Sequence, residues 1–356
     1  MNYFIIAGEI SGDLQGAKLV EALITLDNKA VFKGVGGNCL KNAGVEIIFG
    51  LERTAFMGFF EVVKNIRTVQ KNFKEIKTSI SVYAPDVVIL IDYPGFNLRI
   101  AKWCKQQGIK VVYYISPKFW AWRESRVEKV KANVDLMLCI LPFEVAFYQK
   151  HQYSSAYYVG HPLMHLLQNK QIVLQKNTIA LLPGSRKQEI ISLLPIMLKV
   201  AQQYPNEIFK IAGIKEMETL YPKQLPANVQ LSFNNTYALL QEAKAALVCS
   251  GTSTLETALL KVPQVVLYKT SWLNYQIGKR VIKVPYISLP NLIANTKIVE
   301  ELIQQECNVQ NISTKLNELL NNINSTTKYQ QLYQTIGVQD AAKNAAILIS
   351  KLLNIN

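Results

Sequence analysis

Residues 87–98 of the chain read VVILIDYPGFNL: five apolar residues in a row, then Asp92, then a Pro-Gly turn. A run this short and this apolar is typical of a parallel strand that is buried on both faces. Asp92 therefore lies at the carboxyl end of a predicted strand, the edge where doubly wound sheets bind their ligands. A partly buried carboxylate there suits a general base, because burial raises its pKa; a turn or capping carboxylate fits the pattern as well.

The same alternation of short apolar runs and longer helical stretches continues in both directions from this strand. The predicted strands are 3–7, 31–35, 87–91, 110–115, 136–141 and 157–159 and, beyond a polar stretch at 168–177, 178–182, 208–211, 229–233, 246–249 and 265–268. Strands separated by helices predict an α/β fold with a parallel sheet, and the polar stretch between the two groups of strands predicts two such domains. The final segment, 338–353, is predicted to be one amphipathic helix.

Composition excludes several classes of protein. Of the 356 residues, 49% are hydrophobic and 18% are charged, which is a globular balance. No run approaches the ~18 apolar residues of a membrane-spanning helix, and Glu9 interrupts the apolar N-terminus, so we expect neither a spanning helix nor a signal peptide. The five cysteines lie far apart, and Pro162 follows His161 where the zinc-binding helix motif with His165 requires Glu. We expect a cytoplasmic chain without disulfides or a metal site.

The charge of the chain is strongly positive: 39 Lys and Arg against 25 Asp and Glu give a net charge of +14. Residues 61–131 alone contain 14 basic and six acidic side chains. Such a surface attracts nucleic acid, anionic lipid or a phosphorylated substrate. The charge by itself does not choose among these ligands.

Residues 59–77, FFEVVKNIRTVQKNFKEIK, place apolar side chains at helical spacing with basic side chains between them. A basic amphipathic helix of this kind can rest on an anionic membrane. The same apolar stripe also fits a helix that packs on its own sheet. On the membrane interpretation, the lipid-facing residues are Phe59, Phe60, Val63, Lys64, Ile66, Arg67 and Phe73.

The first predicted strand runs into AGEISGDLQGA, whose glycines follow the spacing G-x3-G-x3-G. This is not the G-x-G-x-x-G of dinucleotide binding, and the second strand ends in GVGG rather than in an acid that would hold a ribose. A nicotinamide-dependent enzyme is therefore disfavoured. Glu9, Ser11 and Asp13 are candidates for binding or catalysis, although Ser11 and Asp13 also suit a helix cap.

A third motif, YYISPKFWAWRESR, combines Trp120 and Trp122 with Arg123 and Arg126. Aromatic side chains interleaved with guanidinium groups bind single-stranded nucleic acid, sugars or lipid headgroups. A helix with a core side and a solvated basic side has the same pattern. The residues leave both interpretations open.

Two loops of the second half follow predicted strands and suit a nucleotide diphosphate. LLPGSRKQE places Gly184, Ser185 and Arg186 at the start of a helix, where backbone N–H groups and the helix dipole favour an anion. In VCSGTSTLETA, small and hydroxyl-bearing residues let a diphosphate approach the backbone, and the carboxylate of Glu256 suits the hydroxyls of a ribose. A capping box formed by Ser253 and Glu256 is the alternative interpretation. Neither loop is a Walker loop. The candidates in the second loop are Ser250, Gly251, Thr252, Thr254 and Glu256.

Taken together, the motifs resemble those of the lipid-A-disaccharide synthase family, inverting glycosyltransferases of Gram-negative bacteria. The resemblance covers nearly the whole chain, in the family's order: AGEISGD, GVGG, MGFFEV, IDYPGFNLR, SPKFWAWR, ILPFE, YVGHPL, LLPGSR, SGTSTLE and SLPN. It implies a GT-B-like α/β fold, with two Rossmann-like, doubly wound parallel-sheet domains facing a cleft. Residues 1–168 would bind the acceptor and lipid, 176–339 would bind the UDP-sugar, and 340–356 would return to the first domain.

The resemblance also implies the reaction and its participants. UDP-2,3-diacylglucosamine would react with 2,3-diacylglucosamine 1-phosphate to give a β(1→6) disaccharide 1-phosphate and UDP, with inversion and without a cofactor or metal. Asp92 would be the base for the 6-hydroxyl, beside the acceptor-side signature Glu9, Ser11 and Asp13. The matching positions that face UDP are Arg186, Glu256, Asn291, Glu301 and Gln304.

The same resemblance places the enzyme peripherally on the cytoplasmic face of the inner membrane. Its expected partners are the two lipid substrates and the anionic membrane surface, not nucleic acid; the oligomeric state stays open, with a homodimer among the alternatives. Two positions depart from the family pattern: Gly95 replaces the second acid of IDxPDF, and Asn295 replaces a common glycine after SLPN. Competing hypotheses are a UDP-sugar 2-epimerase, a transferase with a soluble acceptor, and a basic RNA-binding module.

Overall fold

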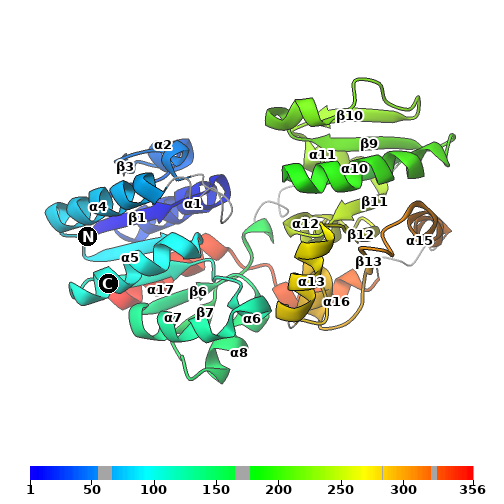
Figure 1. Cartoon of the computed structure of the whole chain (residues 1–356). Helices are drawn as coiled ribbons and strands as arrows, with labels where there is room; N and C mark the ends of the chain where they lie inside the picture. Colours follow the sequence, from blue (N-terminus) through cyan, green and yellow to red (C-terminus); the bar gives the residue numbers. More distant parts are fainter. Residues whose placement is uncertain (55–65, 165–176, 283, 322–326, 356) are drawn as a thin grey trace. The chain divides into compact units, whose positions relative to one another are not determined.

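The computed structural model describes residues 1–54, 66–164, 177–282, 284–321 and 327–355. The chain forms two compact units (Figure 1). Unit 1 comprises Met1–His165 together with Val338–Asn356, and unit 2 comprises Leu166–Gly337.

Unit 1 is built on a seven-stranded sheet in the order β3-β2-β1-β4-β5-β6-β7, in which every neighbouring pair is parallel. The order reverses between β1 and β4, which makes the carboxyl ends of these two strands the topological switch point of a doubly wound sheet. The strands are β1 (Asn2–Ala7), β2 (Val31–Val35), β3 (Glu46–Ile47), β4 (Val87–Ile91), β5 (Lys110–Tyr114), β6 (Leu136–Cys139) and β7 (Ala156–Tyr158).

Alternate side chains of these strands enter two separate cores because a strand points successive residues to opposite faces. Val88 and Leu90 belong to one core, and Val87 and Ile89 to the other. The first core is covered by α4 (Ile66–Tyr83), α5 (Pro94–Gln106), α6 (Phe119–Trp122), α7 (Val127–Asn133) and α8 (Pro142–Lys150). The second is covered by α1 (Ile10–Leu26), α2 (Asn38–Asn42) and α17 (Ala341–Leu353). Short 3₁₀ helices lie at η1 (Leu51–Arg53) and η2 (Glu124–Arg126).

The last helix, α17, belongs to unit 1 although it follows unit 2 in sequence (Figure 1, red). Ala345 and Ala346 are fully buried, and their small side chains let α17 pack closely against α1. Asn344 Nδ2 donates to the carbonyl oxygen of Val159 at 3.1 Å, and Lys110 Nζ donates to the carbonyl of Leu352 at 2.8 Å. The C-terminal segment thus completes the second core of unit 1.

Unit 2 repeats the same design with six parallel strands in the order β10-β9-β8-β11-β12-β13, so its switch point lies between β8 and β11. The strands are β8 (Thr178–Leu182), β9 (Ile208–Gly213), β10 (Val229–Phe233), β11 (Ala243–Cys249), β12 (Gln264–Tyr268) and β13 (Glu300–Ile303). The helices are α10 (Lys187–Gln202), η3 (Lys215–Leu220), α11 (Thr236–Glu242), α12 (Thr252–Leu259), α13 (Trp272–Val281), α14 (Leu289–Ala294), α15 (Val309–Asn321) and α16 (Tyr329–Ile336).

The predicted α/β fold with two doubly wound parallel sheets is confirmed. Two strands, β3 and β13, were not predicted from the sequence. The two-residue β3 is too short to give a pattern, and β13 begins with two acids, Glu300 and Glu301, so it lacks the continuous apolar run of a buried strand.

The described part of the 59–77 helix packs on its own sheet rather than presenting an apolar face. Ile76 and Ile80 are fully buried in the first core of unit 1, and the ring of Phe73 stacks on that of Phe96 with 4.1 Å between centroids. Phe73 is thus partly buried against unit 1, Arg67 is exposed, and the lipid contact of both residues stays a prediction. Phe59, Phe60, Val63, Lys64 and the side chain of Ile66 lie outside the described residues. No helix in the described ranges is long and apolar enough to cross a membrane.

Candidate active site

The switch point of unit 1 brings together two carboxylates from opposite ends of the first hundred residues. Glu9 follows β1 and Asp92 follows β4, and these strands are paired so that Ala7 lies beside Ile91. Burial is the main cause that raises the pKa of Asp92 to about 6, and the negative charge of Glu9 raises it further. The positive charge of Lys118 and the backbone N–H of Tyr93 act in the opposite direction.

The backbone at Asp92 adopts a conformation that few residues accept. Asp92 has a φ of 45° and Tyr93 a φ of 49°, so two consecutive non-glycine residues are left-handed. Such strain persists only where the surroundings enforce it. Here Tyr113 Oη donates to the carbonyl oxygen of Asp92 at 2.5 Å, and Asn97 Nδ2 donates to the same oxygen at 2.8 Å. These two buried side chains therefore hold the Asp92 carboxylate in its orientation.

Gly8 must be glycine because the ring of Tyr93 lies directly against it. A Cβ atom at Gly8 would come within 2.5 Å of that ring. The Tyr93 hydroxyl donates to the carbonyl oxygen of Thr54 at 3.1 Å, and the Thr54 hydroxyl donates to the carbonyl oxygen of Gly8 at 3.0 Å. The ends of β1 and β4 are thus tied together.

Asp13, predicted to be a catalytic candidate, is almost fully buried and bonded within the protein. Its two carboxylate oxygens accept backbone N–H groups from Gly37 at 2.6 Å, Cys39 at 2.9 Å and Leu40 at 3.2 Å. These contacts tie α1 to the first turn of α2 and explain the GVGG sequence, since a Cβ at Gly37 would lie 2.7 Å from the carboxylate. These contacts give Asp13 a scaffolding role, and its catalytic role stays a prediction; Ser11 is exposed on α1.

In unit 2, the loop after β8 is stabilised by a carboxylate that the sequence analysis did not select. Gly184 takes a φ of +114°, and Glu189 Oε2 accepts the backbone N–H groups of Ser185 at 2.9 Å and Arg186 at 3.1 Å. The two N–H groups that were expected to receive an anion are therefore engaged. The Arg186 side chain is 73% exposed, and its guanidinium contacts Glu189 Oε1 at 3.3 Å.

The loop after β11 begins α12 and leaves its first turn accessible. The Ser250 hydroxyl donates to the carbonyl of Ile287 at 2.8 Å, and the buried Thr254 hydroxyl donates to the carbonyl of Gly251 at 2.7 Å. Both hydroxyls shape the loop rather than face a ligand. Gly251 and Thr252 are exposed at the amino end of the helix, where backbone N–H groups favour an anion.

Glu256 is a largely buried acid one turn into α12. Burial raises its pKa, and Tyr237 Oη donates to its Oε1 at 3.3 Å. The alternative capping box with Ser253 does not form, because the Ser253 hydroxyl instead donates to the carbonyl oxygen of Cys249 at 3.3 Å. Among the described residues, the hydrogen bond from Tyr237 engages only Oε1 of Glu256, which leaves Oε2 for a polar partner such as a hydroxyl.

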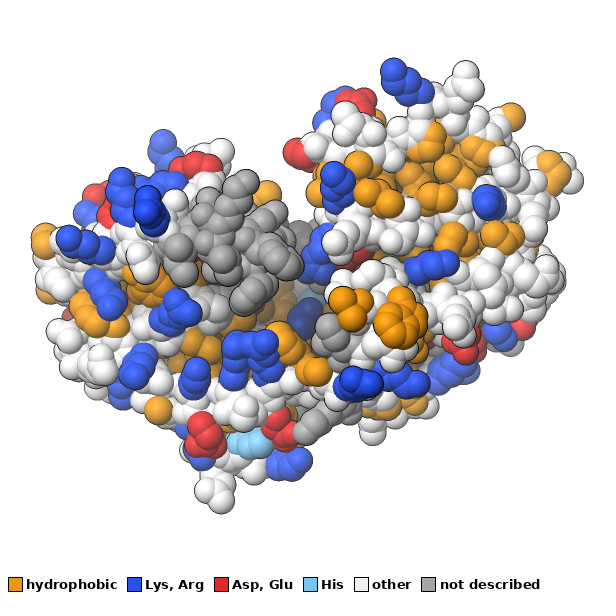
Figure 2. All heavy atoms as spheres, in the orientation of Figure 1, with side chains coloured by type: hydrophobic (Ala, Val, Ile, Leu, Met, Phe, Trp, Pro, Cys, Tyr) orange, Lys and Arg blue, Asp and Glu red, His pale blue; other side chains and the backbone are white. Residues whose placement is uncertain are grey.

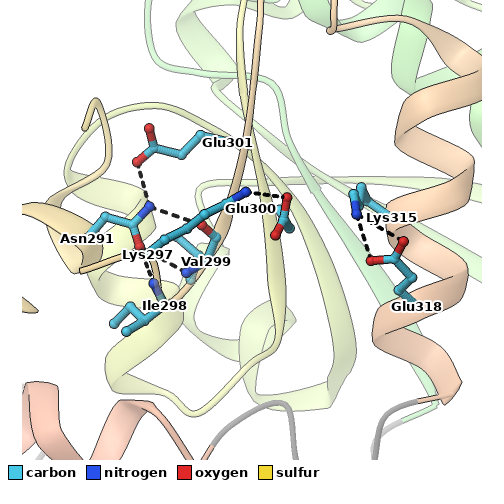
Figure 3. A network of polar contacts seen from close by, with 8 residues as sticks. All are labelled: Asn291, Lys297, Ile298, Val299, Glu300, Glu301, Lys315 and Glu318. Atoms are coloured by element: carbon cyan, nitrogen blue, oxygen red, sulfur yellow. Dashed lines mark hydrogen bonds and ion pairs between the residues drawn. The ribbon is translucent and has the colours of Figure 1, made fainter. Parts of the chain in front are cut away.

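Two other predicted UDP-facing residues, Asn291 and Glu301, belong to an internal network at the edge of the second sheet (Figure 3), and a third, Gln304, is bonded separately. Asn291 is fully buried: its Oδ1 accepts the N–H groups of Ile298 and Val299, and its Nδ2 donates to Glu301 at 2.8 Å. Glu301 also accepts from the N–H of Ile287 and from the N–H and hydroxyl of Ser288. Gln304 pairs with both backbone polar groups of Thr270. The prediction of direct nucleotide contact is therefore wrong for Asn291, and Glu301 and Gln304 likewise build the loops around the site.

In the Trp/Arg motif after β5, the side chain of Trp120 is structural. Its Nε1 donates to buried Glu144 at 3.1 Å, and its ring packs edge-on against Phe143. His161 is buried, which lowers its pKa to about 4, so it is neutral at physiological pH. His165 lies outside the described residues, within which no cluster of three metal-ligating side chains occurs.

Comparison with protein families and relatives gives a consistent result. The family model described as lipid-A-disaccharide synthetase matches residues 3–351. A lipid-A-disaccharide synthase of Syntrophus aciditrophicus is 38% identical over 372 aligned positions, covering 98% of this chain and 97% of the relative. One from Coxiella burnetii is 36% identical, with 98% of both chains covered.

Solved structures share the fold at low sequence identity. The glycosyltransferase of kitacinnamycin superposes with a TM-score of 0.70 at 12% identity, covering 99% of each chain. The UDP-GlcNAc 2-epimerase of Neisseria meningitidis, solved with UDP-GlcNAc, gives a TM-score of 0.61 at 14% identity and covers 100% of each chain. These likenesses establish the GT-B fold.

Replacement of Asp13 separates a scaffolding role from a catalytic one. Asp13→Ala should lower the free energy of unfolding by about 2–3 kcal/mol, because three backbone N–H groups lose a charged acceptor. Urea denaturation measures this change. Ser11→Ala, on the exposed face of the same helix, is the control and should stay within about 0.5 kcal/mol of the parent. Unchanged stability combined with lost activity would instead give Asp13 a catalytic role.

Proposed function

The chain belongs to the lipid-A-disaccharide synthase family. We propose that each of its two switch points binds one of the two substrates of a glycosyl transfer. The enzyme is a glycosyltransferase that transfers 2,3-diacylglucosamine from UDP-2,3-diacylglucosamine to 2,3-diacylglucosamine 1-phosphate. The products are the β(1→6) disaccharide 1-phosphate and UDP. In the proposal, unit 1 holds the acceptor beside Asp92 and unit 2 holds the donor between the loops after β8 and β11.

The placement of Asp92 is the observation that carries the assignment of the base. Its carboxylate lies at the switch point and is fixed by a strained backbone, and its pKa of about 6 leaves it ionised yet basic at neutral pH. In the proposed step, Asp92 takes the proton of the acceptor 6-hydroxyl as the oxygen attacks the anomeric carbon of the donor. The attack comes from the face opposite UDP, which inverts that carbon.

The donor half of the proposal rests on positive groups at the second switch point. The exposed guanidinium of Arg186 and the first-turn N–H groups of α12 receive the diphosphate and stabilise the negative charge that collects on departing UDP. Glu189 keeps Ser185 and Arg186 in place by accepting their N–H groups. The free oxygen of Glu256 suits a hydroxyl of the ribose.

The lipid substrates imply contact with a bilayer, and we place that contact on unit 1. Figure 2 shows many Lys and Arg side chains and few acids on the visible face of this unit. Along α4, Arg67, Lys71 and Lys74 are exposed, on the side away from the core. These cations suit an anionic membrane surface, with a peripheral association that needs no spanning helix.

The function is tested by incubating the purified chain with both lipid substrates and identifying the products by mass spectrometry. We expect a disaccharide 1-phosphate and equimolar UDP. A reaction without the acceptor is the control, and it should release no UDP. Conversion of the UDP-sugar alone into an epimer would contradict the proposed transfer.

Removal of the proposed base gives a sharp kinetic prediction. Asp92→Asn should lower kcat by about 10²–10⁴-fold, because general base catalysis contributes that factor, while donor binding stays at the parent level. Steady-state rates and calorimetric titration with the UDP-sugar measure the two effects. Asp86→Asn is the matched control. Asp86 precedes the amino end of β4, whereas Asp92 follows its carboxyl end, so this variant should retain parental activity. A parental rate for Asp92→Asn would remove Asp92 from the mechanism.

The pH dependence of the rate tests the environment of the base. Since Asp92 acts when deprotonated and its pKa is raised to about 6, kcat/KM should increase with pH through that region and level off above it. Glu9→Gln removes a negative charge that raises this pKa, so the acidic limb should move to lower pH whatever happens to the plateau rate. An unmoved or upward-shifted limb would contradict this arrangement of the two carboxylates.

Arg186 is predicted to act mainly on the donor. Arg186→Ala should weaken UDP binding by about 10–100-fold, because a charge-assisted contact with phosphate is lost. Calorimetric titration with UDP measures the affinity. Lys187→Ala removes an equal charge from the neighbouring exposed position and should have a much smaller effect. Equal affinities of Arg186→Ala and the parent would contradict the proposed contact.

A further inference from the structure

Three basic residues, Lys118, Arg123 and Arg126, follow β5, the strand beside Asp92, and the mechanism above does not use them. β5 pairs with β4, and the backbone N–H of Asp92 donates to the carbonyl oxygen of Tyr114 at 3.0 Å. The chain then turns at Ile115, where φ is 69°, and runs into α6 and η2. Lys118 and Arg123 are exposed on either side of α6, and Arg126 ends η2.

The positive charges of the two arginines in this group oppose each other. Arg126 is partly buried, and this burial together with the charge of Arg123 lowers its pKa. Glu124 lies between them in sequence but contacts His151 at 2.9 Å and Lys150 at 3.7 Å. In the parts of the chain that the structure describes, no carboxylate lies within ion-pair distance of either guanidinium. Such a pair of cations favours an anionic ligand.

An aromatic platform holds one of these cations in place. The guanidinium of Arg123 lies 4.1 Å from the centroid of the Trp122 ring, a cation–π contact, and Trp122 is itself 46% exposed. Meanwhile Phe119 is buried in the core of unit 1 and anchors α6. The basic group therefore sits on a fixed element rather than on a free loop.

The charges around Asp92 differ on its two sides. On the β1 side stands Glu9, whose negative charge raises the pKa of Asp92, and on the β5 side stands Lys118, whose positive charge lowers it. Burial raises the pKa of Glu144, after β6, to about 7 and lowers that of His161, after β7, to about 4; the charge of Lys118 opposes the first shift and adds to the second. An anionic part of a substrate bound at Asp92 is thus attracted toward β5 and repelled from β1.

We propose that Lys118, Arg123 and Arg126 bind the 1-phosphate of the acceptor, an inference that rests on the proposed function. β5 is the direct neighbour of β4, about 4.8 Å away, and the charge of Lys118 acts on Asp92, so an acceptor whose 6-hydroxyl meets Asp92 can extend its phosphate toward this basic group. Phosphate is the anion that arginine pairs with best.

This phosphate site also determines which end of the acceptor reaches the base. With the phosphate on the β5 side, the 6-hydroxyl points to Asp92. In the reversed orientation, the phosphate dianion would lie near Glu9 and Asp92, where like charges oppose it. The charge pattern therefore selects the 6-hydroxyl as the attacking group by excluding the reversed acceptor.

The experiment compares two acceptors that differ only in the phosphate: 2,3-diacylglucosamine 1-phosphate and 2,3-diacylglucosamine with a free 1-hydroxyl. For the parent, the phosphorylated acceptor should have the lower KM. In the double variant Lys118→Met/Arg123→Met, we expect the KM for the phosphorylated acceptor to increase at least tenfold, with the KM for the other acceptor changed less than twofold. Lys129→Met, an exposed lysine on α7, is the control for loss of surface charge and should behave as the parent.

Equilibrium binding of each acceptor, measured without donor, separates failure of this inference from failure of the proposed function. If the double variant loses affinity for both acceptors equally, or for neither, the phosphate site is refuted even when the parent forms the disaccharide. If the parent forms no disaccharide, yet the double variant loses affinity only for the phosphorylated acceptor, the phosphate site stands and the transferase mechanism fails.

Discussion

The pairing of β1 with β4 is the constraint on which the candidate site of unit 1 depends. It places Ala7 beside Ile91, so the residues that follow the two strands, Glu9 and Asp92, emerge at one edge of the sheet although 83 positions separate them in sequence. The helices that follow these strands, α1 and α5, cover opposite faces of the sheet, as in other doubly wound folds. The β8–β11 pairing creates the corresponding switch point in unit 2, between Gly184 and Ser250.

To act as a base, the Asp92 carboxylate at this end of the sheet must have a fixed orientation toward the substrate. The left-handed backbone of Asp92 and Tyr93 has an energetic cost, which two buried donors, Tyr113 and Asn97, offset by bonding to the Asp92 carbonyl. Neither donor contacts the carboxylate itself. They fix the backbone, and the backbone fixes the side chain, so neither buried donor lowers the pKa of the base, and burial outweighs the lowering effect of the Tyr93 N–H group.

The sequence was sufficient to predict which residues follow which strands, and insufficient to predict where their polar atoms would point. Apolar runs such as 87–91 located the switch-point residues, because position at a strand end is a local property. The partners of Asp13 lie 24–27 positions away, and those of Glu301 lie 10–14 positions away. Pairings of this kind depend on tertiary packing, which leaves no local pattern. Glu189 could have been found, since a carboxylate three residues after a helix start is the spacing of a capping box.

The two departures from the family pattern have different physical consequences. Asn295 takes a φ of 50° as it ends α14, and asparagine is among the few side chains that accept this left-handed position. The substitution of a common glycine thus preserves the turn that leads to the Asn291–Glu301 network. Gly95 is exposed in the first turn of α5, where a Cβ would meet nothing within 4 Å, so its lack of a side chain reflects no steric need. What it changes is charge: an acid there would add negative potential close to Asp92, whereas glycine leaves Glu9 and Lys118 as the charges that set the pKa of the base.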